Sequence, residues 1–198
     1  MKKELLYVTS NDGKFAEAAR YIERHEPSIT LKQVDIDVPE VQSMDHRFVA
    51  LDKAAKAWQA LKQPLIIDDS GIYFKRWNQF PGVLTKFVAY GIGIEGLKCL
   101  FDEKDPAYFL LYLVYVDAQG QPHVFEGRCD GTLTKQYTGS VHPALSYDRC
   151  FIPDGLTKTY AELRSDPAYE LYFYRVQALK SFLAWWQHGR RGSLEISC

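Results

Sequence analysis

The segment Leu65-Ile66-Ile67-Asp68-Asp69-Ser70-Gly71 decides the fold. Its three apolar residues are typical of a fully buried strand, and we predict that this strand ends at the acidic pair. Two further strands are predicted at residues 5–8 and 29–36, and each is followed by an amphipathic helix, at 15–22 and 48–58. Such an alternation of strands and helices indicates an α/β domain, in which helices connect the strands.

The second half of the chain has a different pattern. Its predicted elements are helices at about 83–90 and 95–101, a long antiparallel hairpin at 108–116 and 124–134, and a last helix at about 167–187. We therefore predict an α/β fold with an elongated mixed central sheet flanked by helices. Residues 1–188 would form a single domain of two lobes, and residues 189–198 a loose C-terminal tail.

Composition narrows the class of protein. The 198 residues are 46% hydrophobic, and 24 basic against 25 acidic side chains leave a net charge of −1, which argues against binding to nucleic-acid polymers. The longest apolar run, residues 107–116, is about half the length of a membrane span. Residues 1–4 lead directly into a predicted strand and leave no room for a signal peptide. Four widely spaced cysteines without a C-x-x-C pair favour reduced thiols, so we expect a cytoplasmic protein that does not enter membranes.

A polar segment, Thr9-Ser10-Asn11-Asp12-Gly13-Lys14, lies between the first predicted strand and the first predicted helix. Backbone N–H groups at a helix N-terminus, hydroxyls and a nearby lysine suit the binding of a phosphate. The spacing of its glycine differs from that of a Walker A loop. The alternative interpretation is a helix N-cap formed by Asn11 and a solvated Lys14.

The acidic pair Asp68-Asp69 is the second polar segment. Adjacent carboxylates at the end of a buried strand would repel each other unless a cation compensates, and Mg²⁺ accepts carboxylate and phosphate oxygens. An Asx turn with a helix cap is the alternative. Glu40, which follows Pro39 after the second strand, is a candidate third carboxylate, although a loop glutamate is usually solvated.

Three basic residues complete the candidate site. Lys53 lies in the second predicted helix, Lys86 follows Pro81-Gly82, and Arg175 lies close to the apolar face of the last helix. A structural salt bridge is the alternative for Arg175, because a buried charge needs a partner. Carboxylates that hold a metal, together with lysines, suit phosphoryl chemistry on a nucleoside triphosphate.

Taken together, these segments resemble one family, the inosine triphosphate pyrophosphatases, also called non-canonical purine nucleoside triphosphate pyrophosphatases. The resemblance extends from Leu5 to about Leu179; each motif alone is weak, but seven in register are specific. The matching residues are Thr9, Asn11 and Lys14 of T-x-N-x-x-K; Val38-Pro39-Glu40; Lys53 upstream of Asp68-Asp69-Ser70-Gly71; Pro81-Gly82 with Lys86; Gly127-Arg128-Cys129-Asp130-Gly131; and Tyr147-Asp148 with residues 151–155 and 158–163.

The resemblance implies a long active-site cleft, a homodimer, and Mg²⁺-dependent hydrolysis of a nucleoside triphosphate to the monophosphate and pyrophosphate. It implies that Asp69 is the general base, that Lys14 and Lys53 assist catalysis, and that Glu40, Asp68 and Asp69 bind the metal. The implied substrate contacts are Thr9, Ser10, Asn11, Lys14, Lys53, Ser70, Lys86, Leu145, Ser146, Tyr147, Asp148, Tyr169, Tyr174 and Arg175.

The segments that correspond to the family's base pocket depart from its pattern. F-G-[YW]-D reads Leu145-Ser146-Tyr147-Asp148, and in K-x-x-x-S-H-R only Arg175 remains, because Tyr169, Phe173 and Tyr174 replace the other three residues. Arg175 could donate to a 6-oxo purine, which favours ITP, dITP and XTP as substrates. Tyr174 could contact the base, or all three aromatic residues could pack on the sheet. Two alternatives therefore stay open: a non-catalytic nucleotide-binding or scaffold protein, and a pyrophosphatase directed at pyrimidine or modified nucleotides.

Overall fold

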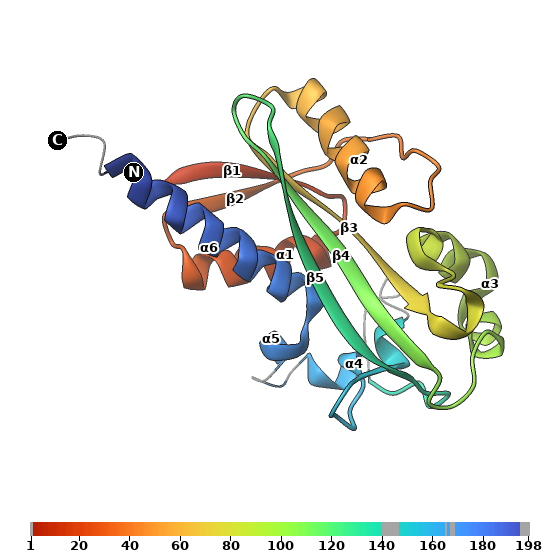
Figure 1. Ribbon diagram of the computed structural model, residues 1–198. Coiled ribbons are helices and arrows are strands. Elements are labelled where there is room, and N and C mark those ends of the chain that lie inside the picture. The colour runs from red at the N-terminus through yellow and green to blue at the C-terminus, as the bar shows by residue number, and fades with distance from the viewer. Residues whose placement is uncertain (1, 140–146, 165, 167–168, 195–198) are drawn as a thin grey trace.

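One six-stranded sheet organises the protein (Figure 1). The computed structural model describes residues 2–139, 147–164, 166 and 169–194. The strands are β1 (Lys3–Val8), β2 (Ile29–Val34), β3 (Leu65–Phe74), β4 (Pro106–Val116), β5 (Pro122–Leu133) and β6 (Phe151–Pro153), in the spatial order β2-β1-β3-β4-β5-β6. The pairs β1–β2 and β1–β3 are parallel, and the pairs from β3 to β6 are antiparallel. The mixed α/β sheet expected from the sequence is confirmed.

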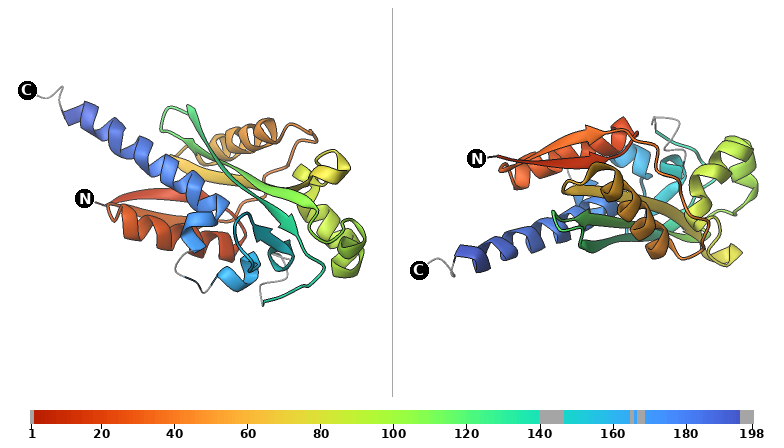
Figure 2. Two further views of the ribbon diagram at one scale, coloured as in Figure 1. Left: turned by 60° about the horizontal axis from the view of Figure 1, so that its bottom comes forward. Right: turned by 90° about the horizontal axis from the view of Figure 1, so that it is seen from above.

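Helices flank both faces of this sheet (Figures 1 and 2). They are α1 (Asp12–His25), α2 (His46–Leu61), α3 (Thr85–Cys99), α4 (Tyr160–Leu163), α5 (Tyr169–Tyr172) and α6 (Tyr174–Leu194), with 3₁₀ turns η1 (Lys75–Trp77) and η2 (Gly82–Leu84). Residues of α1 and α6 share one apolar core, whereas the alanines of α2 belong to a second core. The two predicted helices in the middle of the chain are the two parts of α3, which Gly93 separates with its non-helical φ of 61°.

The hairpin β4–β5 forms the long body of the molecule and runs most of its length (Figure 1). Apolar side chains of β4 alternate between the two cores, so residues 113–116 of this strand are buried on both faces. On β5, Gly127 allows α6 to approach closely, since a Cβ atom there would lie 1.9 Å from the carbonyl oxygen of Tyr174. The long predicted hairpin is therefore confirmed, and the first turn of α6 packs directly against its second strand.

Three local expectations are corrected by the structure. The strand β3 does not end at Asp68 but continues to Phe74, because β4 pairs with it along its whole length. The last predicted helix is divided: α5 ends at Tyr172 and α6 starts at Tyr174. The helix α6 then continues to Leu194, beyond the predicted helix end near Gln187. Among the described residues, no helix is both long and apolar enough to cross a membrane.

Candidate active site

The candidate site lies where the sheet opens beside β3. The strand β1 pairs with β3 only as far as Ile67, and β3 then continues with β4 on its other side. The polar segment after β1 and the acidic pair of β3 therefore meet at the carboxyl end of β1, the position at which open α/β sheets bind ligands. Successive side chains of a strand point to opposite faces, which separates Asp68 from Asp69.

Asp68 lies on the face covered by α1 and α6 and is buried between two cations. Its Oδ1 accepts from Lys14 Nζ at 3.0 Å, and its Oδ2 accepts from Arg175 Nε at 2.9 Å. Burial alone would raise the pKa of Asp68, but Lys14 and Arg175 outweigh this effect and hold that pKa well below its usual range. The opposite end of the Arg175 guanidinium donates through Nη1 to Glu17 Oε2 at 2.5 Å. The negative charge of Asp68 is therefore compensated by the side chains of Lys14 and Arg175.

Asp69 lies on the opposite face, below α2. Its Oδ1 is 3.7 Å from Lys53 Nζ, and its Oδ2 is 2.8 Å from His46 Nε2. Lys53 also donates to Glu40 Oε1 at 2.6 Å. Burial would lower the pKa of Lys53, but Asp69 and Glu40 raise it overall, so the side chain carries its positive charge at neutral pH. The structure thus brings Glu40, Lys53 and Asp69 together.

The segment after β1 is held in shape by local hydrogen bonds. Asn11 caps α1, with its Oδ1 accepting from the backbone N–H of Lys14 at 3.0 Å, and Thr9 Oγ1 accepts from the N–H of Asn11 at 3.1 Å. Gln33 of β2 donates to the Thr9 carbonyl at 3.1 Å. The predicted N-cap is confirmed, and Ser10 is left exposed at the tip of this loop. Lys14 points from the first turn of α1 toward Asp68.

The glycine that ends the motif Asp68-Asp69-Ser70-Gly71 allows a close contact between β3 and the Pro81-Gly82 segment. A Cβ atom at Gly71 would lie 2.3 Å from the carbonyl oxygen of Gly82, so the Pro81-Gly82 segment packs directly on β3. Thr85 secures the contact by accepting from the backbone N–H of Ile72 at 2.8 Å. Lys86, the next residue, is exposed in the first turn of α3 and takes no part in either group of ion pairs around the acidic residues.

The residues expected to contact a base are mostly buried against one another. Asp148 accepts from Arg164 Nε at 3.0 Å, and burial raises the pKa of Asp148 although Arg164 opposes the shift. Tyr169 stacks on Phe173 with ring centroids 4.5 Å apart, and its hydroxyl donates to Glu17 at 3.0 Å. Tyr174 stacks on Phe109 at 4.8 Å, and Tyr147 is buried. The packing alternative for Tyr169, Phe173 and Tyr174 therefore describes this structure. Leu145 and Ser146 lie outside the described residues, and Ser70 is partly buried on β3.

Four site residues escaped the sequence analysis. They are Glu17, His46, Tyr73 and Arg164. A local signal existed only for Glu17, which follows Lys14 by three positions and therefore shares its face of α1. The contacts of the other three depend on how distant elements pack.

The donor set around Lys53 fits a magnesium ion. Glu40 and Asp69 direct carboxylate oxygens at one cationic position, now taken by the ammonium group, and Mg²⁺ is typically held by one or two carboxylates with water and phosphate oxygens. Asp68 does not belong to this group, because it faces Lys14 and Arg175 on the other side of the sheet. Within the described residues, no three acidic, histidine or cysteine side chains gather as a preformed metal site.

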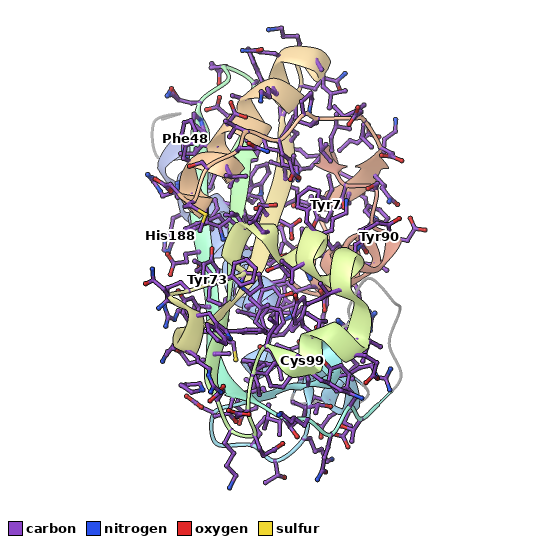
Figure 3. All side chains as sticks on the ribbon, turned by 90° about the vertical axis from the view of Figure 1, so that its right-hand side faces the viewer. Tyr7, Phe48, Tyr73, Tyr90, Cys99 and His188 are labelled. Carbon is purple, nitrogen blue, oxygen red and sulfur yellow. The ribbon has the colours of Figure 1, made fainter. Side chains whose placement is uncertain are left out.

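An apolar pocket of about 330 Å³ lies on α3 and contains none of the predicted site residues. Its walls are Phe80, Leu84, Phe87, Val88, Gly91, Ile92 and Leu100. Beside it, Tyr90 projects from α3 and is 93% exposed (Figure 3). This surface is a candidate for protein contact rather than for phosphate chemistry.

Comparisons with known proteins identify the family of this chain. The chain is 32% identical over 191 residues to the dITP/XTP pyrophosphatase of Methanopyrus kandleri, covering 96% of this chain and 99% of that protein. It is 34% identical over 183 residues to the dITP/XTP pyrophosphatase of Thermococcus kodakarensis, covering 91% and 96%. The structure of the Ham1 protein of Staphylococcus aureus has the same fold, with a TM-score of 0.77 at 23% identity over 94% of this chain and all of that one. Because the Ham1 family model also matches residues 5–185, the chain belongs to the Ham1 family.

Proposed function

We propose that this protein hydrolyses deaminated purine nucleoside triphosphates, such as ITP, dITP and XTP, to the monophosphate and pyrophosphate. The observation that carries the proposal is the position of Asp69, a carboxylate between His46 and Lys53 with Glu40 beside it. The pyrophosphatase names of the relatives support the same reaction class.

In this reaction Asp69 is the general base. It accepts a proton from the water that attacks the α-phosphorus, and the bond to the bridging oxygen breaks as pyrophosphate leaves. A carboxylate fixed from two sides can orient water without reorganising. Lys53, whose charge is held by its acidic neighbours, would stabilise the negative charge that develops on the phosphate oxygens.

Glu40 and Asp69 would hold Mg²⁺, and that ion when bound neutralises phosphate charge and polarises the reacting phosphoryl group. Lys14 and the N-terminus of α1 would receive the outer phosphates, together with the hydroxyls of Thr9, Ser10 and Ser70. Two features support this assignment: Lys14 is anchored by Asp68, and Asn11 already shapes the loop. Lys86 is proposed to contact the substrate from the first turn of α3.

A second candidate concerns the base. The Nε and Nη1 atoms of Arg175 donate to Asp68 and Glu17, and the neighbouring Tyr169 and Tyr174 are buried. This arrangement favours a pyrophosphatase whose base preference is not set by Arg175 and has shifted toward other nucleotides. The first candidate keeps a purine contact along the proposed cleft, which requires buried side chains to turn from their present packing toward the substrate. The residues assigned to that contact are Tyr147, Asp148, Tyr169, Tyr174 and Arg175, together with Leu145 and Ser146.

We further propose a homodimer that works in a cytoplasm. The exposed side chains of Phe87, Tyr90 and Ile92 on α3 form an apolar surface suited to a second copy. The buried thiols of Cys129 and Cys150 are unpaired, which suits a reducing compartment. Light scattering coupled to size-exclusion chromatography tests the dimer. The wild-type protein should have twice the mass of one chain, and the double variant Phe87→Ser with Tyr90→Asp should have the mass of a single chain. A monomeric wild-type protein would contradict the proposal.

A substrate panel tests the proposed reaction. ITP, dITP, XTP, ATP, GTP, CTP, UTP and dTTP are incubated with the protein and Mg²⁺, and phosphate is measured with and without added inorganic pyrophosphatase. Phosphate that appears only with the added enzyme supports pyrophosphate release, and the fastest substrate identifies the base preference. If the folded protein with Mg²⁺ releases neither phosphate nor pyrophosphate from any of these nucleotides, the proposal is overturned in favour of a nucleotide-binding or scaffold protein.

A further inference from the structure

His46 is a buried residue outside the sequence motifs that touches the candidate base. It is the first residue of α2, after the N-cap Asp45, and it is 4% exposed. Its Nδ1 lies 2.7 Å from the hydroxyl of Tyr73, and its Nε2 lies 2.8 Å from Oδ2 of Asp69. The ring of Tyr112 packs edge-on against the imidazole at 5.4 Å. The imidazole is therefore held between a strand tyrosine and the reactive carboxylate.

The contact between His46 and Asp69 has the length of a hydrogen bond but not its alignment. The Nε2 atom is buried and makes no aligned hydrogen bond to any described residue. Leaving such a group unsatisfied is costly, and Oδ2 of Asp69 is the acceptor that lies within hydrogen-bond distance of it. Catalytic hydrogen bonds are often poorly aligned in unliganded enzymes and tighten when substrate binds.

The hydroxyl of Tyr73 bears on which nitrogen of His46 carries the ring proton. Burial and the neighbouring Tyr108 raise the pKa of Tyr73, so its hydroxyl keeps its proton at neutral pH. Tyr73 is itself fixed by stacking on Tyr108, with centroids 4.8 Å apart and planes 1° apart. When the hydroxyl donates to Nδ1 of the neutral ring, the ring proton is on Nε2 and points toward Asp69.

We propose that His46 is a positioning residue for Asp69: its Nε2–H holds Oδ2, and Tyr73 fixes the tautomer that makes this possible. Oδ1 is thereby directed toward Lys53 and the attacking water. The catalytic consequence rests on the proposed function, whereas the tautomer and the contact are properties of the protein alone. Removing the contact should slow the chemical step and leave substrate binding unchanged.

Three variants separate positioning from simple packing. His46→Gln keeps an N–H close to the place of Nε2, His46→Leu removes it with a side chain of similar bulk, and Tyr73→Phe removes only the hydroxyl. With ITP and Mg²⁺, we expect kcat of His46→Leu to fall by about 10-fold or more with KM nearly unchanged, and His46→Gln to restore most of the loss. Equal losses in the Gln and Leu variants, or a loss confined to KM, would overturn the proposal.

Nuclear magnetic resonance of histidine labelled with ¹⁵N tests the contact without any activity. The spectrum of the wild-type protein should show the Nε2–H tautomer for His46, assigned by its disappearance in His46→Gln, and its proton should shift in Asp69→Asn. A proton on Nδ1, or a resonance indifferent to Asp69→Asn, would overturn the proposal even if the protein is an active pyrophosphatase. If no triphosphate is hydrolysed, the proposed function fails and this spectrum still decides the contact.

Discussion

Asp68 and Asp69 are neighbours in the chain, yet they face opposite sides of the sheet. Asp68 is buried between Lys14 and Arg175, and Asp69 lies with His46 and Lys53 below α2. The period of two in a strand imposes this separation. The two carboxylates therefore have different partners: Asp68 organises the cations on the α1 side, and Asp69, the proposed base, contacts His46 and Lys53 of α2.

Asp69→Asn should abolish turnover and leave the fold intact. The amide has nearly the same shape but cannot accept the proton of the attacking water, so kcat should fall by about 10²- to 10⁴-fold. Initial rates with ITP and Mg²⁺, together with thermal unfolding, check this. Activity close to wild type in a folded Asp69→Asn protein would exclude Asp69 as the base.

Lys53→Met should also be severely impaired. The ammonium group bridges Glu40 and Asp69, so its loss leaves two neighbouring carboxylates uncompensated and removes a charge that stabilises the transition state. We expect kcat/KM to fall by about 10²-fold or more. Lys98→Met is the matched control, because Lys98 pairs with Glu95 on α3 and lies over the ring of Tyr137, outside both groups of ion pairs around Asp68 and Asp69. If both variants behave alike, Lys53 has no special role.

The ion pairs of Asp68 should make stability depend on pH in acid. Because the folded protein holds the pKa of Asp68 below its unfolded value, the stabilisation is complete above about pH 4 and is lost as the pH falls from there through the folded value. Urea midpoints measured from pH 7 to pH 2 should decline more steeply below pH 4 in wild type than in Asp68→Asn. A carboxyl ¹³C titration of Asp68 in the intact protein provides a direct check, and a pKa of 4 or above would contradict the pairing.

Arg175→Lys distinguishes a structural arginine from one that recognises the base. A lysine cannot reproduce the two-sided contact with Asp68 and Glu17, so unfolding free energy should fall by about 2 kcal/mol. The ratio of kcat/KM for ITP to that for ATP should change little, because the guanidinium is already engaged. A ratio that collapses while stability is unchanged would show instead that Arg175 binds the 6-oxo group.

Much of the fold could be predicted because its signals are local. The apolar run at Leu65, the N-cap at Asn11 and the two halves of the hairpin all appear where their patterns placed them. The end of β3 could not be predicted, since polar residues at 68–70 resemble a strand end unless the pairing of β4 is known. The last helix also extends beyond its predicted end near Gln187, since residues 188–193 show no apolar periodicity.

The site was only partly predictable for a related reason. The family resemblance grouped Glu40, Asp68 and Asp69 as metal ligands, whereas the structure brings Glu40 and Asp69 together with Lys53 and leaves Asp68 with Lys14 and Arg175. The partners of Asp68 lie 54 and 107 residues away in the chain, so no local pattern connects them to it. His46 carried no signal, because only the packing of α2 on β3 brings its ring to Asp69.

The position of bond cleavage tests the central claim most directly. ITP is incubated with the wild-type protein and Mg²⁺, and the products are followed by ³¹P nuclear magnetic resonance without any coupling enzyme. Attack on the α-phosphorus predicts the signals of IMP and pyrophosphate in equal amounts, with neither signal in Asp69→Asn. The appearance of IDP and inorganic phosphate would contradict the account.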